Sequence, residues 1–364
     1  MPRAHSPPAV PTEAWPGAFP PVLGSFRARG AEMNMLERAI RERHPTVLAL
    51  VGAGGSGKST LAAALGQRLA QFFGGRLLWV RMGGWSAGTV LELMGHQLRV
   101  AGESRIRRVL GAAPTLVVLD NHEDDRATAE LLRRFESSPV TWIITARRCL
   151  LGGVTIVPVA PPLIGEGESP FPRVAKLTRI LRWHPVALSL ADALVMRRHT
   201  TVAALGRSLL RRRIDRIVPI EHEDDLPEVG AMVAESTAHA SAAGIRMLAV
   251  LASSGGDHMD RTALHALARA RRSAPSALDT LVAMRIVDEP LPGRYALHAT
   301  VRHALRKRLS LDEDAIAAYY LSRFERGDAS RALDVTHLFA LMDWAQAKSD
   351  VGLILRVRAL TTSS

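Results

Sequence analysis

One glycine-rich stretch of the sequence reads Gly52-Ala53-Gly54-Gly55-Ser56-Gly57-Lys58-Ser59. It follows a short apolar run, residues 46–51, and it precedes a stretch with helical periodicity, residues 59–73. Glycines let a backbone curl until several N–H groups converge on one phosphate, and the start of the next helix adds its positive dipole end. The stretch therefore predicts a P-loop that binds the phosphates of a nucleotide. The candidate binding residues are Gly52, Gly54, Gly55, Ser56, Gly57, Lys58, Ser59 and Thr60.

Two of these side chains have particular tasks in a P-loop. Lys58 is expected to bridge the β- and γ-phosphates, and the Ser59 hydroxyl is expected to ligate Mg²⁺. No guanine-reading motif stands out in the sequence, which favours adenine over guanine. The predicted cofactors are therefore ATP or ADP together with Mg²⁺.

Short apolar runs alternate with helical patterns through the first half of the chain. Such alternation is typical of a parallel sheet whose strands are buried on both faces by helices. We also expect an inserted strand between the P-loop strand and the strand that ends at Asp120. The predicted fold class is an α/β P-loop NTPase followed by a helical domain, a winged-helix domain and a short helical tail. The expected strands are residues 46–51, 76–81, 115–119, 140–145 and 154–159.

An aspartate ends the third of these runs, Leu116-Val117-Val118-Leu119-Asp120. The carboxyl ends of parallel strands are where such sheets bind ligands, so we expect Asp120 to hold Mg²⁺ through water. The next residue is Asn121 rather than an acid, which leaves Glu123 or Asp124 as the general base if there is one. This pattern predicts slow ATP hydrolysis.

An arginine follows the next run, Trp142-Ile143-Ile144-Thr145-Ala146-Arg147. Because its strand would run parallel to the Asp120 strand, Arg147 could reach the γ-phosphate, with Arg148 as a second candidate. An arginine on a solvated loop is the plainer alternative. The sequence shows neither an arginine-rich lid nor an acceptor pocket, which argues against a small-molecule phosphotransferase.

The composition sets outer limits on function. The formal charge is +12 among 364 residues, but only four of the 47 basic residues are lysines. A GC-rich genome also favours arginine, so the charge indicates nucleic-acid binding only weakly. The single cysteine excludes an internal disulfide framework and fits a cytoplasmic protein. No apolar run approaches the roughly 18 residues of a membrane span, so we expect no membrane partner.

Shifts in composition divide the chain into six predicted parts. A hairpin of residues 286–289 and 294–298 after several helices predicts the winged helix. The parts are a disordered Pro-rich leader (1–24), a P-loop nucleotide-binding domain (25–165), a helical domain (166–220), a linker (221–235), a winged-helix domain (236–310) and a helical tail (311–364).

With these features in order, the chain resembles the signal-transducing ATPases with numerous domains (STAND), including the NB-ARC proteins, and in particular their bacterial type. Residues 26–32 look like the segment before the family's first helix, with Arg29 at its arginine and Ala28 at its usual glycine. Residues 116–121 followed by Glu123 look like the family's Mg²⁺ strand, and residues 144–147 resemble its arginine sensor. The resemblance implies that Arg29 belongs to the nucleotide site.

Two later motifs extend the resemblance. His184-Pro185-Val186-Ala187-Leu188 is similar to the helical-domain motif whose proline packs on adenine, although Trp183 stands where a glycine is usual. Residues 295–302 resemble the winged-helix segment whose histidine, here His298, contacts the β-phosphate of ADP. The resemblance implies a switch that ADP holds closed and ATP opens for self-assembly.

The helical patterns near the end of the sequence suggest which partners the protein has. Residues 338–345 and 353–360 resemble the first helical hairpin of a long sensor arm, and the sequence stops at Ser364. We therefore expect either a fragment or a protein whose effector and sensor are supplied by partner chains. The alternative function is a winged-helix DNA-binding ATPase. Its candidate phosphate contacts are Arg269, Arg271, Arg272, Arg302, Arg306, Lys307 and Arg308.

Overall fold

The computed structural model describes residue 19 and residues 29–83, 85–160, 171–212, 226–269, 275–310, 312–329 and 333–362. Their contacts divide the chain into two compact units. The first unit comprises the described residues up to Gly52 and from Gly57 to Val159. The second comprises Ala53–Ser56 and the described residues from Ala160 onward.

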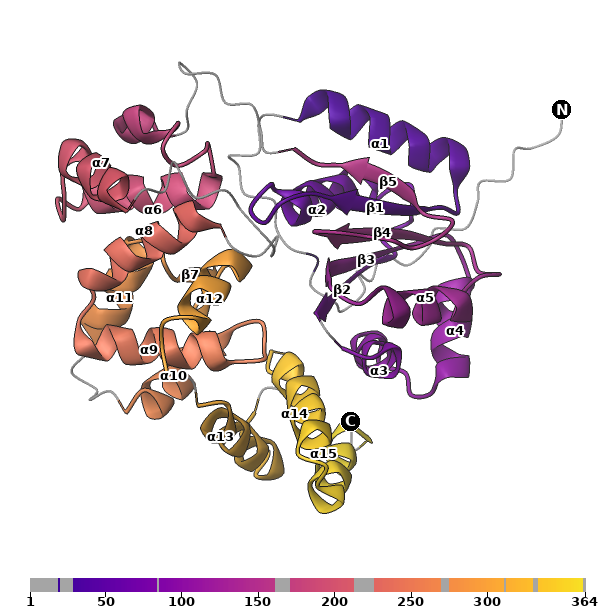
Figure 1. Cartoon of the computed structure of the whole chain (residues 1–364). Helices are drawn as coiled ribbons and strands as arrows, with labels where there is room; N and C mark the ends of the chain where they lie inside the picture. The colour runs from indigo at the N-terminus through magenta and orange to yellow at the C-terminus, as the bar shows by residue number, and fades with distance from the viewer. Residues whose placement is uncertain are drawn as a thin grey trace, which may run out of the picture. The chain divides into compact units, whose positions relative to one another are not determined.

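The first unit is built on one parallel sheet of five strands in the order β2-β3-β4-β1-β5 (Figure 1). All five predicted strands are present, and β4 lies between β1 and β3 as expected for an inserted strand. The parallel α/β fold class is therefore confirmed. The strands are β1 (Val47–Val51), β2 (Leu77–Gly83), β3 (Thr115–His122), β4 (Val140–Ala146) and β5 (Thr155–Pro158).

Helices cover both faces of this sheet (Figure 1). One core joins α1 and α2 to alternate residues of the strands, such as Leu50, Val118 and Ile143, because side chains alternate across a strand. On the other side α3 packs against α4 and α5. The helices are α1 (Gly30–Arg43), α2 (Lys58–Leu69), α3 (Ala87–Leu98), α4 (Glu103–Gly111) and α5 (Asp125–Arg134).

Phe19 corrects one part of the predicted leader. Its ring lies edge-on to that of Trp79, with 5.2 Å between the centroids. It also packs on Gly66 of α2, where an added Cβ would lie 2.2 Å from the Phe19 Cζ. The prediction of disorder therefore does not hold at Phe19, and the rest of the predicted leader lies outside the described residues.

The second unit is mainly helical and has one continuous hydrophobic core. The linker predicted at 221–235 is partly wrong, because a helix begins at Pro227, a residue whose fixed φ suits the first helical position. Residues 221–225 lie outside the described part of the chain. The elements up to the second sheet are η1 (Pro172–Leu177), α6 (Pro185–Met196), α7 (Val202–Arg211), α8 (Pro227–Ala238), α9 (Ala242–Ser253), α10 (Arg261–Leu267) and α11 (Pro275–Ala283).

A small antiparallel sheet follows, with the order β6-β8-β7. It contains β6 (Met259–Asp260), β7 (Asp288–Leu291) and β8 (Arg294–Ala296), and α12 (Ala299–Arg306) comes next. The predicted hairpin exists but starts later than expected, because Ile286 and Val287 are buried in the core instead of pairing. Gly293 makes the turn with a φ of +74°.

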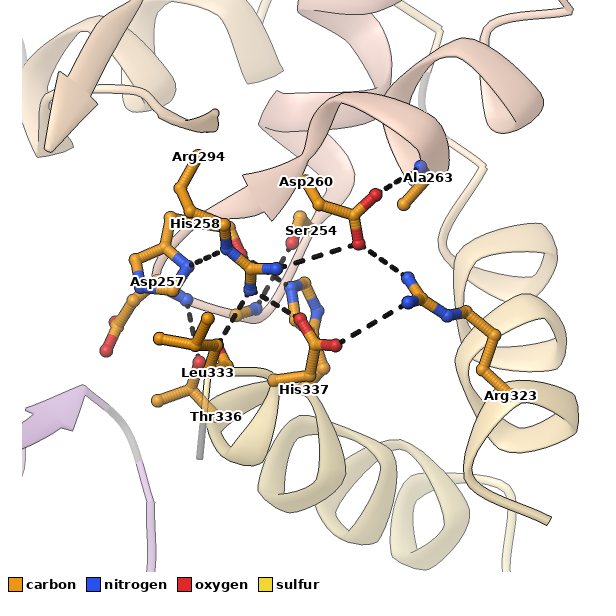
Figure 2. A network of polar contacts seen from close by, with 12 residues as sticks. Ser254, Asp257, His258, Asp260, Ala263, Arg294, Arg323, Leu333, Thr336 and His337 are labelled. Carbon is orange, nitrogen blue, oxygen red and sulfur yellow. Dashed lines mark hydrogen bonds and ion pairs between the residues drawn. The ribbon is translucent and has the colours of Figure 1, made fainter. Parts of the chain in front are cut away.

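Three helices form the tail: α13 (Glu313–Glu325), α14 (Val335–Ala347) and α15 (Val351–Thr362). The last two pack side by side and are the yellow helices of Figure 1. A buried polar network joins the tail to the second sheet (Figure 2). In it the Arg294 guanidinium of β8 donates to Asp334, at the start of α14, and to the Leu333 carbonyl at 2.8 Å.

His337 completes this network from α14. Burial lowers the pKa of its imidazole to about 4. The neutral ring lies 3.7 Å from the Tyr320 ring, nearly parallel to it, and its Nε2 lies 2.9 Å from the His258 carbonyl. A neutral imidazole can donate one hydrogen bond there without bringing a charge into the core. None of the helices in the described part of the chain is long and apolar enough to cross a membrane.

Candidate nucleotide-binding site

The predicted P-loop joins β1 to α2 in the strand–loop–helix order that the motif requires. Two of its glycines have positive φ values, +75° at Gly55 and +87° at Gly57. Side chains other than glycine are strained in this left-handed region, so the sequence allows a curl that most residues would resist. Gly57 is also the N-cap of α2, which places Lys58 and Ser59 in the first helical turn.

Lys58 and Ser59 both make defined contacts within the first unit. The Lys58 ammonium donates to the Gly52 carbonyl at 2.8 Å, across the base of the loop. The Ser59 hydroxyl donates to Asp120 Oδ1 at 2.6 Å. The two oxygens that the sequence predicted as Mg²⁺ ligands are therefore adjacent, although they come from α2 and β3.

Thr145 fixes the position of the Asp120 carboxylate. Its hydroxyl donates to Asp120 Oδ1 at 2.6 Å and accepts from the Asn121 amide at 2.9 Å. Asn121 has a φ of +59°, and the pairing of β3 with β4 is irregular between Leu119 and His122. The sequence analysis missed Thr145, whose only signal is a hydroxyl at the end of an otherwise apolar strand.

Glu123 and Arg147 lie together at the same sheet edge. The Arg147 guanidinium is 3.7 Å from Glu123 Oε1, and the Asn121 side chain donates to the same oxygen at 2.7 Å. Asp124 has a different task, because its carboxylate caps α5 by accepting from two backbone amides. The structure therefore favours Glu123 over Asp124 of the two candidate bases. Arg148 is exposed.

Lys58 carries the strongest electrostatic signal in this site. Burial, reinforced by the charge of Arg147, lowers the pKa of Lys58 to about 8, and Asp120 partly opposes the shift. A phosphate beside the ammonium would favour its charged form and raise this pKa again. Nucleotide binding should therefore take up a proton above pH 8 but not below it.

This linkage predicts a pH dependence of ADP affinity. Affinity should be constant below about pH 8 and should fall roughly tenfold per pH unit above it, because the free site then holds fewer protons than the bound one. Titration calorimetry between pH 7 and 9.5, repeated in two buffers of different ionisation enthalpy, measures both the affinity and the proton uptake. A flat affinity without uptake would contradict the prediction.

Arg29 also lies beside the loop in the first unit. It is 6% exposed, and its Nη1 donates to Glu32 at 2.8 Å. Its Nη2 would lie 3.9 Å from a Cβ added to Gly57. Thr60, one position after Ser59, is exposed. The predicted phosphate-loop residues of this unit and Arg29 are thus close neighbours.

The middle of the loop, Ala53–Ser56, belongs to the second unit by its contacts. His184 Nε2 lies 2.8 Å from the Gly54 carbonyl, and His184 Nδ1 accepts from the Ala187 amide at 3.4 Å. Burial lowers the pKa of His184. Because Nδ1 accepts, a neutral ring carries its proton on Nε2, which donates to the Gly54 carbonyl. The sequence pattern marked His184 only as the neighbour of Pro185 and gave no sign of this contact.

Gly55 to alanine is expected to be more disruptive than an ordinary glycine substitution in a turn. The φ of +75° costs alanine about 1–2 kcal/mol. In addition, the new Cβ would lie 2.5 Å from His184 Cε1, so the ring would have to move and lose its hydrogen bond, worth about 1 kcal/mol. Denaturant unfolding should show a loss of about 2–3 kcal/mol.

Gly74 provides a matched control for this prediction. It has a φ of +58°, and a Cβ there would meet nothing within 4 Å. Gly74→Ala should therefore show only the backbone cost. In a His184→Ala background the extra cost of Gly55→Ala should disappear. Equal costs at both glycines would mean that His184 does not constrain the loop.

The remaining predicted residues lie at the starts of two helices of the second unit. Pro185 is in the first turn of α6, and Trp183 just before it has a φ of +57°, the conformation that favours glycine. His298 caps α12, where its Nδ1 accepts from the Thr300 amide at 3.3 Å. The same turn faces the loop, because a Cβ on Gly54 would lie 2.6 Å from the Thr300 methyl group.

The residues present fit a nucleotide with Mg²⁺. The loop has glycines where a Cβ would be strained or would collide, at Gly54, Gly55 and Gly57. Lys58 provides a positive charge, and Ser59 and Asp120 provide two neighbouring oxygen ligands of the kind that Mg²⁺ prefers. These groups would hold the phosphates and the metal.

Known proteins are similar to this chain in sequence and in fold. The chain is 27% identical over 370 residues to regulatory protein AfsR of Streptomyces coelicolor, an alignment that covers 88% of this chain and 35% of AfsR. In fold it is similar to a STAND protein with a tetratricopeptide repeat sensor from Pyrococcus horikoshii. That match has a TM-score of 0.57 and 16% identity, and it covers 96% of this chain and 52% of the other.

These matches confirm the predicted resemblance to the STAND P-loop ATPases. The chain spans only about a third to a half of the length of these two proteins. A Walker-type ATPase of Pyrococcus abyssi also matches, at 15% identity over 76% of this chain and 95% of the other, but its TM-score of 0.36 is too low to support an argument. No protein-family model matches the sequence.

Proposed function

We propose that this STAND-like P-loop protein is a regulatory switch that binds ATP and ADP with Mg²⁺ and hydrolyses ATP slowly. The observation that carries the proposal is the junction of Lys58, Ser59 and Asp120, where the Ser59 hydroxyl and the Asp120 carboxylate are 2.6 Å apart at the start of α2. ADP would favour a closed state, and ATP would favour an open one that assembles with itself or engages a partner.

Slow hydrolysis follows from the surroundings of Glu123. Its carboxylate accepts from Asn121 and pairs with Arg147, so two neighbours compete for the oxygen that a general base would use. We assign Glu123 to the alignment of water and Arg147 to contact with the γ-phosphate. Arg29, Thr60 and Pro185 complete the proposed nucleotide site.

The switch needs a route from the loop to the rest of the chain. We propose that the helices and hairpin of residues 236–310 form a winged-helix domain and that residues 166–220 form the helical domain. His184 forms a hydrogen bond with Gly54, and Thr300 lies close to Gly54. These contacts support the proposal that both domains respond to the position of the middle of the loop. His298, in the same turn as Thr300, would contact the β-phosphate of ADP.

The test begins with the nucleotide carried by freshly purified protein. Mass spectrometry should find ADP, and addition of ATP with Mg²⁺ should increase the particle size on a sizing column. Protein that is empty, and that takes up no Mg-nucleotide at millimolar concentration, would overturn the proposal. If the protein binds nucleotide but its particle size does not change, self-assembly is excluded. Engagement of an effector or sensor chain would then be the output of the switch.

His298 offers a more specific test of the closed state. Asparagine is a good N-cap residue, so His298→Asn should keep α12 capped while removing the imidazole. We expect ADP to dissociate about tenfold faster, which corresponds to the loss of one hydrogen bond of about 1.4 kcal/mol. His303→Ala, on the same helix, is the control. Unchanged ADP release from His298→Asn would exclude the proposed contact.

Two of the candidate phosphate contacts of the alternative, a DNA-binding ATPase, already have partners within the protein, whereas Arg269, Lys307 and Arg308 are exposed. Arg302 donates to the carbonyls of Ser254 and Gly256, and Arg306 donates to that of Ala252 at 3.0 Å. These guanidinium groups therefore bind the protein itself. Arg271 and Arg272 lie outside the described residues. Duplex binding with a steep salt dependence, independent of nucleotide, would favour this alternative.

A further inference from the structure

Three side chains of types that can ligate metals lie close together in the first unit, beyond Asp120. His122 ends β3, Asp125 begins α5, and Cys149 follows β4. One ligand atom from each, an imidazole nitrogen, a carboxylate oxygen and the thiol sulfur, all lie within 4.8 Å of one another. The nucleotide site described above uses none of these three side chains.

The surrounding structure fixes the orientation of the His122 ring. His122 is 4% exposed, and its Nδ1 lies 2.7 Å from the hydroxyl of Thr128, which is completely buried. Its Nε2 consequently points to Asp125 Oδ1 at 2.9 Å. Metal-binding histidines generally use one nitrogen for the metal while a neighbour hydrogen bonds to the other, and Thr128 provides that neighbour.

The loop that carries Cys149 is tied to the same point. The Leu150 amide donates to both carboxylate oxygens of Asp125, at 3.2 and 3.3 Å. Asp125 and Cys149 are only partly buried, so an ion could reach them from solvent. The site is thus held from three elements and open on one side.

We propose that His122, Asp125 and Cys149 bind a zinc ion. One nitrogen, one sulfur and one oxygen ligand suit this borderline metal, and three protein ligands leave the fourth tetrahedral position for water or a partner. Zinc–nitrogen and zinc–oxygen bonds near 2.1 Å place tetrahedral ligands about 3.4 Å apart. His122 Nε2 and Asp125 Oδ1, at 2.9 Å, would need to separate by only about half an ångström.

This zinc site is distinct from the Mg²⁺ site proposed at Ser59 and Asp120. Mg²⁺ prefers oxygen ligands, whereas a thiolate selects softer metals. Binding breaks the S–H bond of Cys149, and its proton leaves to solvent. The ion would join the strand end two residues after Asp120 to the loop two residues after Arg147. It would thereby stabilise the segments that carry both proposed nucleotide contacts.

Cobalt provides the direct test, because thiolate-to-cobalt charge transfer absorbs in the near ultraviolet. The full chain, freed of nucleotide and metal with a chelator, is titrated with Co²⁺. The chain contains one cysteine, so any such band must come from Cys149. We expect a band that saturates at one Co²⁺ per chain, d–d bands of tetrahedral intensity, and displacement of both by one equivalent of Zn²⁺.

Three variants separate the proposed site from the cysteine alone. Cys149→Ser should abolish the band, and Asp125→Asn should weaken Co²⁺ binding at least tenfold. His122→Gln should do the same, with circular dichroism to check that the buried position still folds. The matched control is Asp124→Asn, which removes a neighbouring charge but keeps an N-cap for α5.

Two results of the Co²⁺ titration would overturn the zinc proposal. Absence of the band in the wild-type chain would overturn the proposal, and so would a band that survives equally in Asp125→Asn and His122→Gln. Zinc should also raise the melting temperature of the wild type but not of Cys149→Ser. Since no nucleotide is present, these results do not depend on the proposed switch.

Discussion

Replacing Lys58 with alanine is expected to abolish nucleotide retention, with a loss of ADP affinity of about 100-fold. The Lys58 ammonium is largely buried and is the positive charge of the loop, donating to the Gly52 carbonyl at 2.8 Å. Removing the proposed charged partner of the ADP phosphates should cost about 2–5 kcal/mol of binding free energy, and about 2.8 kcal/mol corresponds to 100-fold. Mass spectrometry of the purified variant and calorimetric titration with ADP measure the effect.

Lys348→Ala is the matched control for Lys58→Ala. It removes the same side chain from α14, where Lys348 pairs with exposed Asp314. This variant should retain nucleotide like the wild type. Thermal unfolding should also show that Lys58→Ala remains folded, because the shorter side chain creates no clash. Retention of ADP by folded Lys58→Ala would remove the basis of the proposed site.

The first unit was largely predictable because its signals are local. Five short apolar runs were expected as strands, and all five are present in one parallel sheet. Strands buried on both faces need continuous apolar sequence, which marks their positions along the chain. The aspartate at the end of the third run lies next to Ser59, as the strand-and-loop pattern indicated.

The elements that the sequence failed to predict depend on contacts between distant residues. The helix from Pro227 begins just after a polar, acidic stretch, and its buried face is set by packing inside the second unit. Phe19 is fixed by Trp79, and His184 is fixed by a backbone carbonyl of the loop. No periodicity marks such partners. Only the chemistry of a hydroxyl at a strand end hinted at Thr145.

Trp183 shows how a resemblance can hold despite an unexpected residue. Trp183 in place of the family's usual glycine put the backbone before α6 in doubt, and Trp183 has a left-handed φ of +57°. Arg182 before it is also left-handed, with a φ of +48°. Backbone hydrogen bonds close the turn before α6, from the Trp183 amide to the Thr178 carbonyl at 2.8 Å and from the His184 amide to the Leu181 carbonyl at 2.9 Å, although its residues disfavour a left-handed backbone.

Replacing Arg294 with alanine is expected to lower the free energy of unfolding of the second unit by about 3–5 kcal/mol. The Asp334 carboxylate is completely buried, and Arg294 is its direct ion-pair partner in the network that joins the tail to the second sheet. Arg323 is a more distant cation, 3.9 Å from the other carboxylate oxygen of Asp334. Breaking a buried ion pair from one side costs this much because the other charge loses its partner. Denaturant unfolding measures the effect.

A matched variant distinguishes burial from the mere presence of an ion pair. Arg326 also pairs with an aspartate, Asp328 at 2.8 Å, but both side chains are more than half exposed. Arg326→Ala should therefore change stability by less than about 1 kcal/mol. The double variant Arg294→Met with Asp334→Leu should recover most of the loss, since it removes both charges.

The network also predicts which segment of Arg294→Ala loses stability first. Arg294 lies on β8, and Asp334 lies at the N-terminus of α14, so their pair holds the tail helices to the second sheet. Hydrogen exchange in Arg294→Ala should increase first in α14, before the parallel sheet of the first unit is affected. Uniform acceleration across both units would show that the pair supports the whole fold. If hydrogen exchange accelerates only in α14, the Arg294–Asp334 ion pair couples the second sheet to the tail helices.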